Sequence, residues 1–290
     1  MERGGGIYIK NSSPLITNCK IQTNAAGSGG GIYAEDNSIP TVKFSIISGN
    51  NATLGGGVYN LSSNSILNNC LITGNQSFGG AAMYNNRSNP VLNNLTISGN
   101  DCVVGHIFNT SISGNVSNPV IKNSILWSNT GALDNLSTIT YSIVEGGFTG
   151  AGNLNINPQF VSGQVASSAP TVLGNYRVVY GSPSVDAGDN SLISLTDLDL
   201  DGNLRRYDGA TVDMGAYELI GNFDTADSGT WALNSTWKCN CIPDGSLPVR
   251  IMGNHEVSIP DGMTGQAKGL KFVGNGKLLP LGTGSINIVR

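Results

Sequence analysis

Short apolar runs separated by polar corners recur along the first half of the chain. One row of equivalent apolar positions contains Ile21, Ile47, Ile72, Ile97 and Leu126. A second row contains Ile16, Val42, Leu67, Leu92 and Ile121. The runs are only a few residues long, are rich in Ile and Val, and lack the apolar period of a helix, so they predict short β-strands.

These strands belong to an internal repeat. The stretch GGGIY at residues 29–33 returns as GGGVY at residues 55–59. The aromatic position recurs in steps of 24 to 26 residues, at Tyr8, Tyr33, Tyr59, Tyr84 and Phe108. Each unit closes on an asparagine, at Asn24, Asn50, Asn75, Asn100 and Asn129. Because several rows keep the same step, the chain contains a repeat of about 25 residues.

Units of this length without a helix are typical of the coils of a parallel β-helix, which stack about 4.8 Å apart. Leucine-rich, ankyrin and tetratricopeptide repeats need a helix or a denser leucine pattern. We therefore expect an all-β fold with roughly five or six coils over residues 4–145, both apolar rows facing inward. A further row marks a bend, where asparagine tolerates left-handed backbone angles and stacked amides can bond; it contains Asn18, Phe44, Asn69, Asn94 and Asn123.

Composition narrows the class of partner. Only 12% of the residues are charged and the net charge is -4, so there is no basic stripe to bind nucleic acid. No apolar run is long enough to form a transmembrane segment. The sequence enters a repeat by residue 4 without an apolar leader, and we expect an N-terminally truncated part of a longer, exported protein.

The pattern divides the chain into three regions. Residues 1–145 are the coils of the β-helix. Residues 146–221 are irregular, and we expect them to cover the last coil, whose unpaired strand edges would otherwise invite aggregation. Residues 222–290 keep the alternation of β-strands but lose the repeat, which predicts a separate and incomplete β-rich module.

The covering region carries specific expectations. Phe160 and Val161 would plug the last coil, and strands around Val178 and Met214 would pair outside the regular stack. Carboxylates that bond backbone amides would hold its irregular turns, namely Asp186, Asp199, Asp201 and Asp213.

The cysteines are expected to be unpaired fillers. Cys19 and Cys70 occupy one row two coils apart, roughly 9 to 10 Å, which is too far for a disulfide. Cys239 and Cys241 have only His255 near them in sequence, fewer than the four ligands of a structural zinc site.

An acidic stretch is a candidate metal site. In DLDLDGN, Asp197, Asp199 and Asp201 alternate, and Asp208 falls at the twelfth position of a calcium-loop spacing. Hard carboxylate oxygens in a tight glycine turn suit Ca²⁺, which would be a structural ion here. The alternative is a structural turn, in which Asp199 and Asp201 bond backbone amides or Arg205.

The aromatic row is a candidate ligand site. Strand alternation turns the five aromatic side chains outward, because the neighbouring apolar residues face the core. A ladder of rings about 4.8 Å apart could form a platform for sugar rings, or it could be packing that shields the sheet. The row contains Tyr8, Tyr33, Tyr59, Tyr84 and Phe108.

Coils with Gly-Gly-apolar-aromatic corners resemble the right-handed parallel β-helix repeats of bacterial surface proteins, including polymorphic outer-membrane proteins and pectate-lyase-like domains. The later stretches NINPQFV, GSPSVDAGD, DLDGNLRR and DMGAYE are similar to the ending of secreted β-helix proteins of Bacteroidetes. Residues 222–290 resemble small β-rich modules of surface and carbohydrate-associated proteins. The resemblance covers residues 4–219 and implies a secreted or cell-surface location.

Enzymes on this fold stack carboxylates on successive coils, with a basic residue opposite. The equivalent turn here carries a mixed set, namely Lys10, Glu35 with Asp36, Leu61 and Arg87. His106 has no acid at a matching position. We therefore expect a non-catalytic stalk for adhesion or glycan binding, whose partner is a polysaccharide or another cell-surface ligand. The alternative is a pectate-lyase-like lyase or a hydrolase acting on acidic polysaccharide.

Overall fold

The structure is a computed structural model of the 290-residue chain. It describes residues 2–112, 115–179, 181–206, 211–219, 223–237, 242–243, 249–267, 269–272 and 274–288. The chain divides into two compact units, Met1–Leu219 and Ile220–Arg290, each considered by itself below.

The first unit contains a parallel β-helix whose described coils build four sheets, named here in chain order. The first sheet contains β1 (Ile7–Lys10), β5 (Ile32–Glu35), β9 (Val58–Leu61), β13 (Met83–Asn86) and β17 (Ile107–Asn109). The second contains β2 (Leu15–Thr17), β6 (Thr41–Lys43), β10 (Ile66–Asn68), β14 (Val91–Asn93), β20 (Val120–Lys122) and β22 (Thr138–Thr140). The third contains β3 (Lys20–Gln22), β7 (Ile46–Ser48), β11 (Leu71–Thr73), β15 (Thr96–Ser98), β21 (Ile125–Trp127) and β23 (Ile143–Val144). The fourth contains β4 (Ala25–Ser28), β8 (Asn51–Leu54), β12 (Gln76–Gly79) and β16 (Asp101–Val104).

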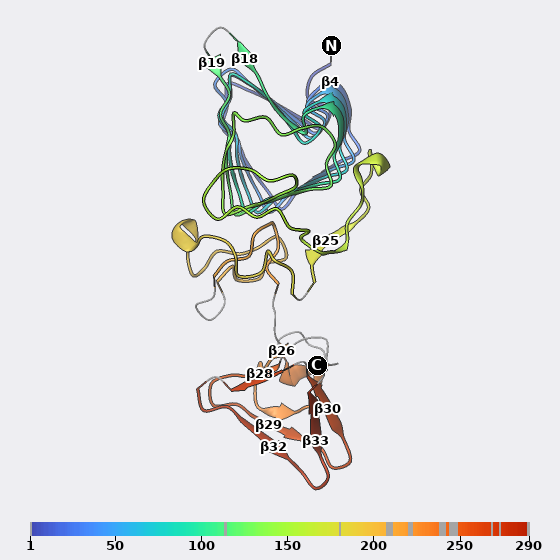
Figure 1. The fold of residues 1–290 in the computed structure, drawn as a ribbon, viewed down its shortest axis with the longest axis vertical. Coiled ribbons are helices and arrows are strands. Elements are labelled where there is room, and N and C mark those ends of the chain that lie inside the picture. Colours follow the sequence, from blue (N-terminus) through green and yellow to red (C-terminus); the bar gives the residue numbers. More distant parts are fainter. Residues whose placement is uncertain are drawn as a thin grey trace. The chain divides into compact units, whose positions relative to one another are not determined.

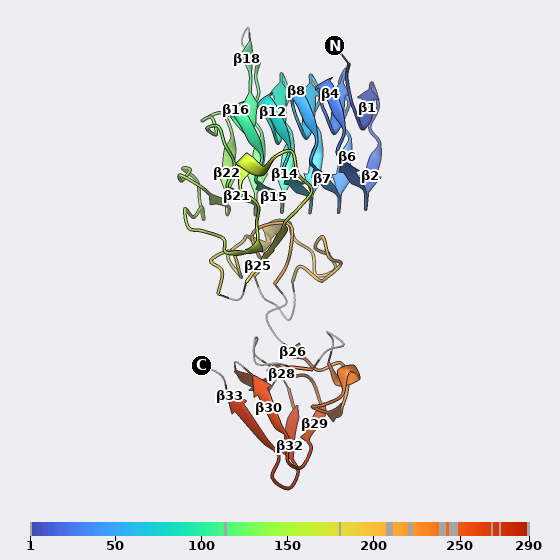
Figure 2. The same cartoon turned by 90° about the vertical axis from the view of Figure 1, so that its right-hand side faces the viewer.

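The register confirms the stacked coils. Ile47 pairs with Ile72 in the third sheet, and Leu67 pairs with Leu92 in the second. All four side chains are buried in one core that runs through the stack. Figure 1 shows the coils end on and Figure 2 shows the strands side by side along the stack. A short hairpin of β18 (Ser111–Ile112) and β19 (Asn115–Val116) interrupts one coil and accounts for its greater length.

The bend between the second and third sheets is also confirmed. The residue at this corner has a positive φ of 49° to 54° in each coil, at Asn18, Phe44, Asn69, Asn94, Asn123 and Tyr141. The predicted amide ladder at this corner is wrong, however, because the side-chain oxygens do not bond one another. Asn69 Oδ1 accepts from Arg205, Asn123 Oδ1 accepts from the backbone amide of Asp189, and Asn94 Oδ1 has no partner among the described residues. The ladder lies at the next corner, where Asn75 Nδ2 donates to Asn100 Oδ1 at 2.9 Å inside the stack.

Glycine is required at the corner before the first sheet. A Cβ atom at Gly56 would lie 2.7 Å from the carbonyl oxygen of Gln76 and 2.8 Å from that of Ala81. Only a residue without a side chain allows the coils to approach so closely. The glycine triplets of the repeat therefore follow from stacking.

The last coil is closed by a different residue from the one expected. Val144 donates to the carbonyl oxygen of Leu154 at 2.9 Å, and the ring of Phe148 packs against the end of the core. The predicted plug by Phe160 and Val161 is wrong, since Val161 is 53% exposed and Phe160 contacts Tyr176 on the outside of the third sheet. The coil is sealed sooner after β23 than the sequence pattern indicated.

Residues 156–219, called the side segment here, run back along the outer face of the third sheet (Figure 2). The segment contains β24 (Phe160–Ser162), β25 (Asn175–Val178) and the 3-10 helices η1 (Ala166–Ser168) and η2 (Asn190–Leu192). Val178 pairs with Phe160 outside the stack, as expected. Met214 is buried but lies outside any strand, so that part of the expectation is wrong. Its backbone amide instead donates to the carbonyl oxygen of Ser184 at 2.9 Å.

The second unit also contains a repeat, so the expectation that residues 222–290 lose the repeat is wrong. Its described strands pair in parallel with steps of mainly 21 residues, for example Val249 with Leu270 and Glu256 with Lys277. The three sheets contain β26 (Phe223–Asp224), β28 (Val249–Ile251) and β31 (Leu270–Phe272); β27 (Gly229–Thr230), β29 (Glu256–Ile259) and β32 (Lys277–Pro280); and β30 (Thr264–Ala267) and β33 (Ser285–Ile288). Trp231 and Trp237, flanking η3 (Asn234–Thr236), fill its core. The unit is a second, narrower stack of coils.

Candidate functional site

The aromatic row forms a continuous stack on the first sheet. Ring centroids lie 4.9 Å apart between Tyr33 and Tyr59 and again between Tyr59 and Tyr84, with nearly parallel planes. Tyr8 and Phe108 extend the stack at its two ends, at 5.8 and 5.3 Å. Tyr33 and Tyr59 are buried, whereas Tyr8 is 47% exposed. The faces of the inner rings are therefore covered by neighbouring rings, which favours the packing role.

Sugar binding on this aromatic row remains a prediction, and the structure restricts the surface on which a sugar could stack to one end of the row. A sugar ring stacks on an aromatic face, and the structure leaves an exposed ring at Tyr8. The inner tyrosines have no free face to offer. Burial raises the pKa of Tyr33 to about 12, as expected for a phenol held away from water.

A charged cluster surrounds the Tyr8 end of the row. Glu35 is buried and accepts hydrogen bonds from Arg3 Nη1 at 2.7 Å and from the Tyr8 hydroxyl. Lys10 Nζ lies 3.3 Å from Asp36 Oδ2. The hydrogen bond to Glu35 raises the pKa of Tyr8, and the bond to Asp36 raises the pKa of Lys10. Both shifts move the groups away from neutral pH, which makes them poor proton carriers.

The described carboxylates of the acidic stretch, Asp197, Asp199 and Asp201, accept hydrogen bonds from other groups of the protein. Asp199 is buried and accepts bonds from the backbone amides of Asp201, Asn203 and Glu218 at 2.7 to 2.9 Å. Asp201 forms a bidentate pair with Arg177 and not with Arg205. These contacts make the stretch a bonded turn.

The remaining candidate calcium ligands do not complete a site in the described part. Asp197 accepts a bond from the backbone amide of Ser194 at 2.8 Å. Asp208 lies outside the described residues, as do Cys239 and Cys241. Within the described ranges, no three His, Cys, Asp or Glu side chains gather as a metal-binding group. Calcium binding therefore stays a prediction that depends on Asp208.

A groove lies on the outer face of the fourth sheet. Its volume is about 350 Å³, and it is lined by Asn51, Ala52, Gln76, Ser77, Phe78, Asp101, Cys102 and Val103. Gln76 pairs with Asn51 on one side and with Asp101 on the other, so three polar side chains are aligned along the stack. Phe78 is 56% exposed and Val103 is 73% exposed. The groove thus combines an open aromatic face with a row of amides and one carboxylate.

Neighbouring segments hold the polar side chains of this groove in place. Gln76 Nε2 donates to Asp101 Oδ2 at 3.3 Å and to the carbonyl oxygen of Ala169 at 3.4 Å. Asp101 Oδ1 accepts from the Thr130 hydroxyl at 2.7 Å. These bonds orient the amide and the carboxylate and leave lone pairs on both for a ligand. Asp101 is the one charged residue among the described residues that line the groove.

The sequence analysis missed this groove, although a signal was present. Asn51, Gln76 and Asp101 directly follow Asn50, Asn75 and Asn100, which form the inward ladder. Strand alternation then turns the following residue outward in each coil. A polar residue at this position in three successive units, with Phe78 two positions further on, marks an exposed row.

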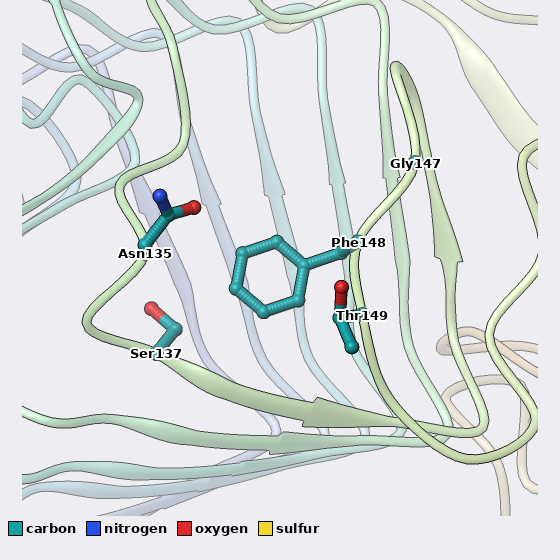
Figure 3. A pocket seen from close by; sticks show the side chains of 5 residues that line it. All are labelled: Asn135, Ser137, Gly147, Phe148 and Thr149. Atoms are coloured by element: carbon teal, nitrogen blue, oxygen red, sulfur yellow. The ribbon is translucent and has the colours of Figure 1, made fainter.

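The end of the β-helix holds a pocket of larger volume. It is lined by Asn135, Ser137, Gly147, Phe148 and Thr149, and has a volume of about 610 Å³. Figure 3 shows the Phe148 ring reaching across the opening toward Asn135 and Ser137. Ser137 Oγ accepts from Asn109 Nδ2 at 3.2 Å, so part of the polar lining is bonded to the buried coil. The pocket is the place where Phe148 seals the core.

Three described groups with shifted pKa values, Asp213, Glu218 and His106, lie outside the groove. Burial raises the pKa of Asp213 to about 7 and that of Glu218 to about 9, but both lie in the side segment with their oxygens bonded. Burial lowers the pKa of His106, whose Nδ1 donates to the carbonyl oxygen of Gly131 and whose Nε2 is buried. None of these groups lines the groove.

The fold can now be compared with known proteins. No curated protein matches the chain. Among the described residues, no helix has the length and apolar character needed to span a membrane. The family described as the right-handed beta helix region matches residues 2–156, which is more than half of the chain. The parallel register of the coils agrees with that match, and the chain belongs to the right-handed β-helix family.

Proposed function

We propose that this protein is a non-catalytic β-helix that binds a neutral glycan in the groove of the fourth sheet, as part of a secreted or cell-surface adhesion stalk. The observation that carries the proposal is the exposed Phe78 beside the aligned side chains of Asn51, Gln76 and Asp101. Planar amides and carboxylates bond neighbouring sugar hydroxyls, and an exposed aromatic face packs on the apolar face of a sugar ring.

The spacing of the groove indicates how the glycan lies. The three polar side chains occur once per coil, so they are about 4.8 Å apart along the stack. This distance is comparable to the length of one sugar unit in an extended polysaccharide. The bound polysaccharide would therefore run parallel to the β-helix axis, with one sugar unit for each coil.

The charge of the groove favours a neutral polymer. Asp101 would repel the carboxylates of a uronate polymer, and no described Lys or Arg lines the groove to offset that repulsion. This feature also disfavours the alternative of a lyase acting on acidic polysaccharide, which needs a base and a positively charged group at the substrate carboxylate.

Calorimetric titration with neutral and acidic polysaccharides tests the proposal. The wild-type protein should bind at least one neutral polymer, and Phe78→Ala should weaken that binding by about tenfold or more, equivalent to about 1.4 kcal/mol. Leu15→Ala is a matched control, because Leu15 is 66% exposed on the second sheet outside the groove. Equal binding by the Phe78 and Leu15 variants would refute the groove as the site. Release of unsaturated products from polygalacturonate would favour the lyase alternative.

A further inference from the structure

A second pocket lies where the side segment crosses the corner between the second and third sheets. It is lined by Lys43, Phe44, Asn68, Asn69, Asn93, Asn94, Asn123, Leu192, Ile193 and Asp197, and its volume is about 240 Å³. Five asparagines, Lys43 and Phe44 come from the coils, whereas Leu192, Ile193 and Asp197 come from the side segment. The pocket is more enclosed than the groove, which lies on the outer face of the fourth sheet.

One residue that lines this pocket carries an acceptor with no partner among the described residues. Asn94 is 4% exposed, and its Oδ1 atom is buried without a hydrogen bond. The equivalent corner amides on either side are occupied, since Asn69 Oδ1 accepts from Arg205 and Asn123 Oδ1 accepts from the backbone amide of Asp189. A buried carbonyl oxygen left unpaired is unfavourable, because it has lost its hydrogen bonds to water without gaining another. The pocket at Asn94 therefore calls for a molecule that donates a hydrogen bond.

The lining limits the charge and size of that molecule. Lys43 opposes a bound cation and Asp197 opposes a bound anion, so the two charges together favour a neutral ligand. The volume is below the range of about 300 to 1,000 Å³ typical of pockets for drug-sized ligands. Phe44 and Ile193 provide apolar surface beside the amides. A compact molecule with several hydroxyl groups and one apolar face matches all three features.

We infer that this pocket binds a single neutral sugar unit, with a hydroxyl group donating to Asn94 Oδ1. The neighbouring amides of Asn68 and Asn93 would bond the remaining hydroxyls, and the carboxylate of Asp197 would accept a hydrogen bond from one of them. The inference is independent of glycan binding in the groove, because the two sites share no residue.

Binding of a panel of neutral monosaccharides, measured by calorimetry and ligand-observed NMR, tests the inference. At least one sugar should bind the wild-type protein with an affinity of about millimolar strength. Asn94→Gly should abolish that binding, and glycine tolerates the positive φ of 54° at this corner without backbone strain. Asn18→Gly is the matched control, because Asn18 has the same φ at the same corner of the first coil but does not line the pocket.

Two further variants separate this site from the groove. Asp197→Asn should weaken monosaccharide binding, whereas Phe78→Ala should leave it unchanged. Melting curves of all variants establish that each is folded at the temperature of the titration. The inference is overturned if no monosaccharide binds, if Asn94→Gly binds as well as wild type, or if a crystal soaked in the sugar holds only water at Asn94. Any of these results leaves the proposed groove intact, and loss of polysaccharide binding in the groove leaves this pocket intact.

Discussion

Arg205 of the side segment donates from Nε to Oδ1 of Asn69, a corner residue of the β-helix, at 2.9 Å. The Arg205 side chain is fully buried, and its other nitrogens donate to Glu218 Oε2 at 3.1 Å and to the carbonyl oxygen of Gly215 at 2.7 Å. One guanidinium group thus connects the coils to the two ends of a buried loop. The side segment also forms one wall of the pocket at Asn94, and this connection anchors that segment to the coils.

Replacing Arg205 should detach the side segment. Arg205→Ala leaves the buried oxygens of Asn69, Glu218 and Gly215 without their donor, at a cost of about 1 to 3 kcal/mol for each unpaired acceptor. Hydrogen exchange should accelerate over residues 181–219 while the core strands of the coils stay protected. Arg177→Ala is the control, since Arg177 pairs with the half-buried Asp201 and should cost about 1 kcal/mol or less. Unchanged exchange in the side segment of Arg205→Ala would contradict the anchoring role.

Stability should fall as the pH rises through the neutral range. Burial raises the folded-state pKa of Asp213 from 3.8 to about 7 and that of Glu218 from 4.5 to about 9. Between the unfolded and folded pKa values the folded state holds more protons, so stability decreases as the pH rises from about 4 toward 9. Arg205 is the cation that acts on both carboxyls, and Asp186 is a further charge that acts on Asp213.

Urea denaturation at several pH values measures this dependence. Glu218→Gln should be close to wild type in stability at low pH, because the amide and the protonated carboxyl of Glu218 are both neutral and similar in size. Its stability should fall less steeply between pH about 5 and 9, since the titrating carboxyl is gone. Identical slopes in the two proteins would show that Glu218 does not titrate in this range.

The asparagine ladder should contribute strongly to the stability of the coils. Asn75 Oδ1 accepts from the backbone amide and the Nδ2 group of Asn50, and all of these atoms are buried. Asn75→Ala leaves those donors unpaired and should lower the free energy of unfolding by about 3 kcal/mol. Asn24→Ala, at the half-buried end of the ladder, should cost about 1 kcal/mol. Equal losses in urea denaturation would indicate that the ladder adds nothing beyond a single corner bond.

The tyrosine stack makes a separate prediction. Tyr59 is 7% exposed and packs between Tyr33 and Tyr84, so Tyr59→Ala should cost about 3 to 5 kcal/mol. Phe78→Ala removes an exposed ring and should change stability by about 0.5 kcal/mol or less. Thermal melting distinguishes them. A Tyr59 variant as stable as the Phe78 variant would argue against packing as the function of the row.

Repetition explains why the coils were predictable from the sequence and the side segment was not. Ile47 and Ile72 recur at one step, and a parallel stack is the arrangement that places such a row in one core. Phe148 and Phe160, in contrast, belong to no repeated row of the sequence. Nothing in the sequence around either residue indicates which ring seals the core and which ring packs on the third sheet. The contact between Arg205 and Asn69 spans 136 positions and has no periodic signal.

The second unit and the groove show a different limit. The 21-residue step of the second unit does have a sequence signal, because Met-Gly-Asn at residues 252–254 returns as Val-Gly-Asn at residues 273–275. A search tuned to the period of the first coils overlooks this shorter one. The groove follows from alternation alone once Asn75 is placed inward, but the choice between an inward and an outward asparagine needs the coil geometry.

The most direct test of glycan binding is a crystal structure of the protein soaked in the neutral oligosaccharide that binds best in the calorimetric titration. The account predicts a sugar ring packed on Phe78, hydroxyl groups within hydrogen-bond distance of Gln76 and Asp101, and a chain that runs parallel to the β-helix axis. An empty groove at saturating oligosaccharide, or a chain bound along the tyrosine row instead, would contradict it.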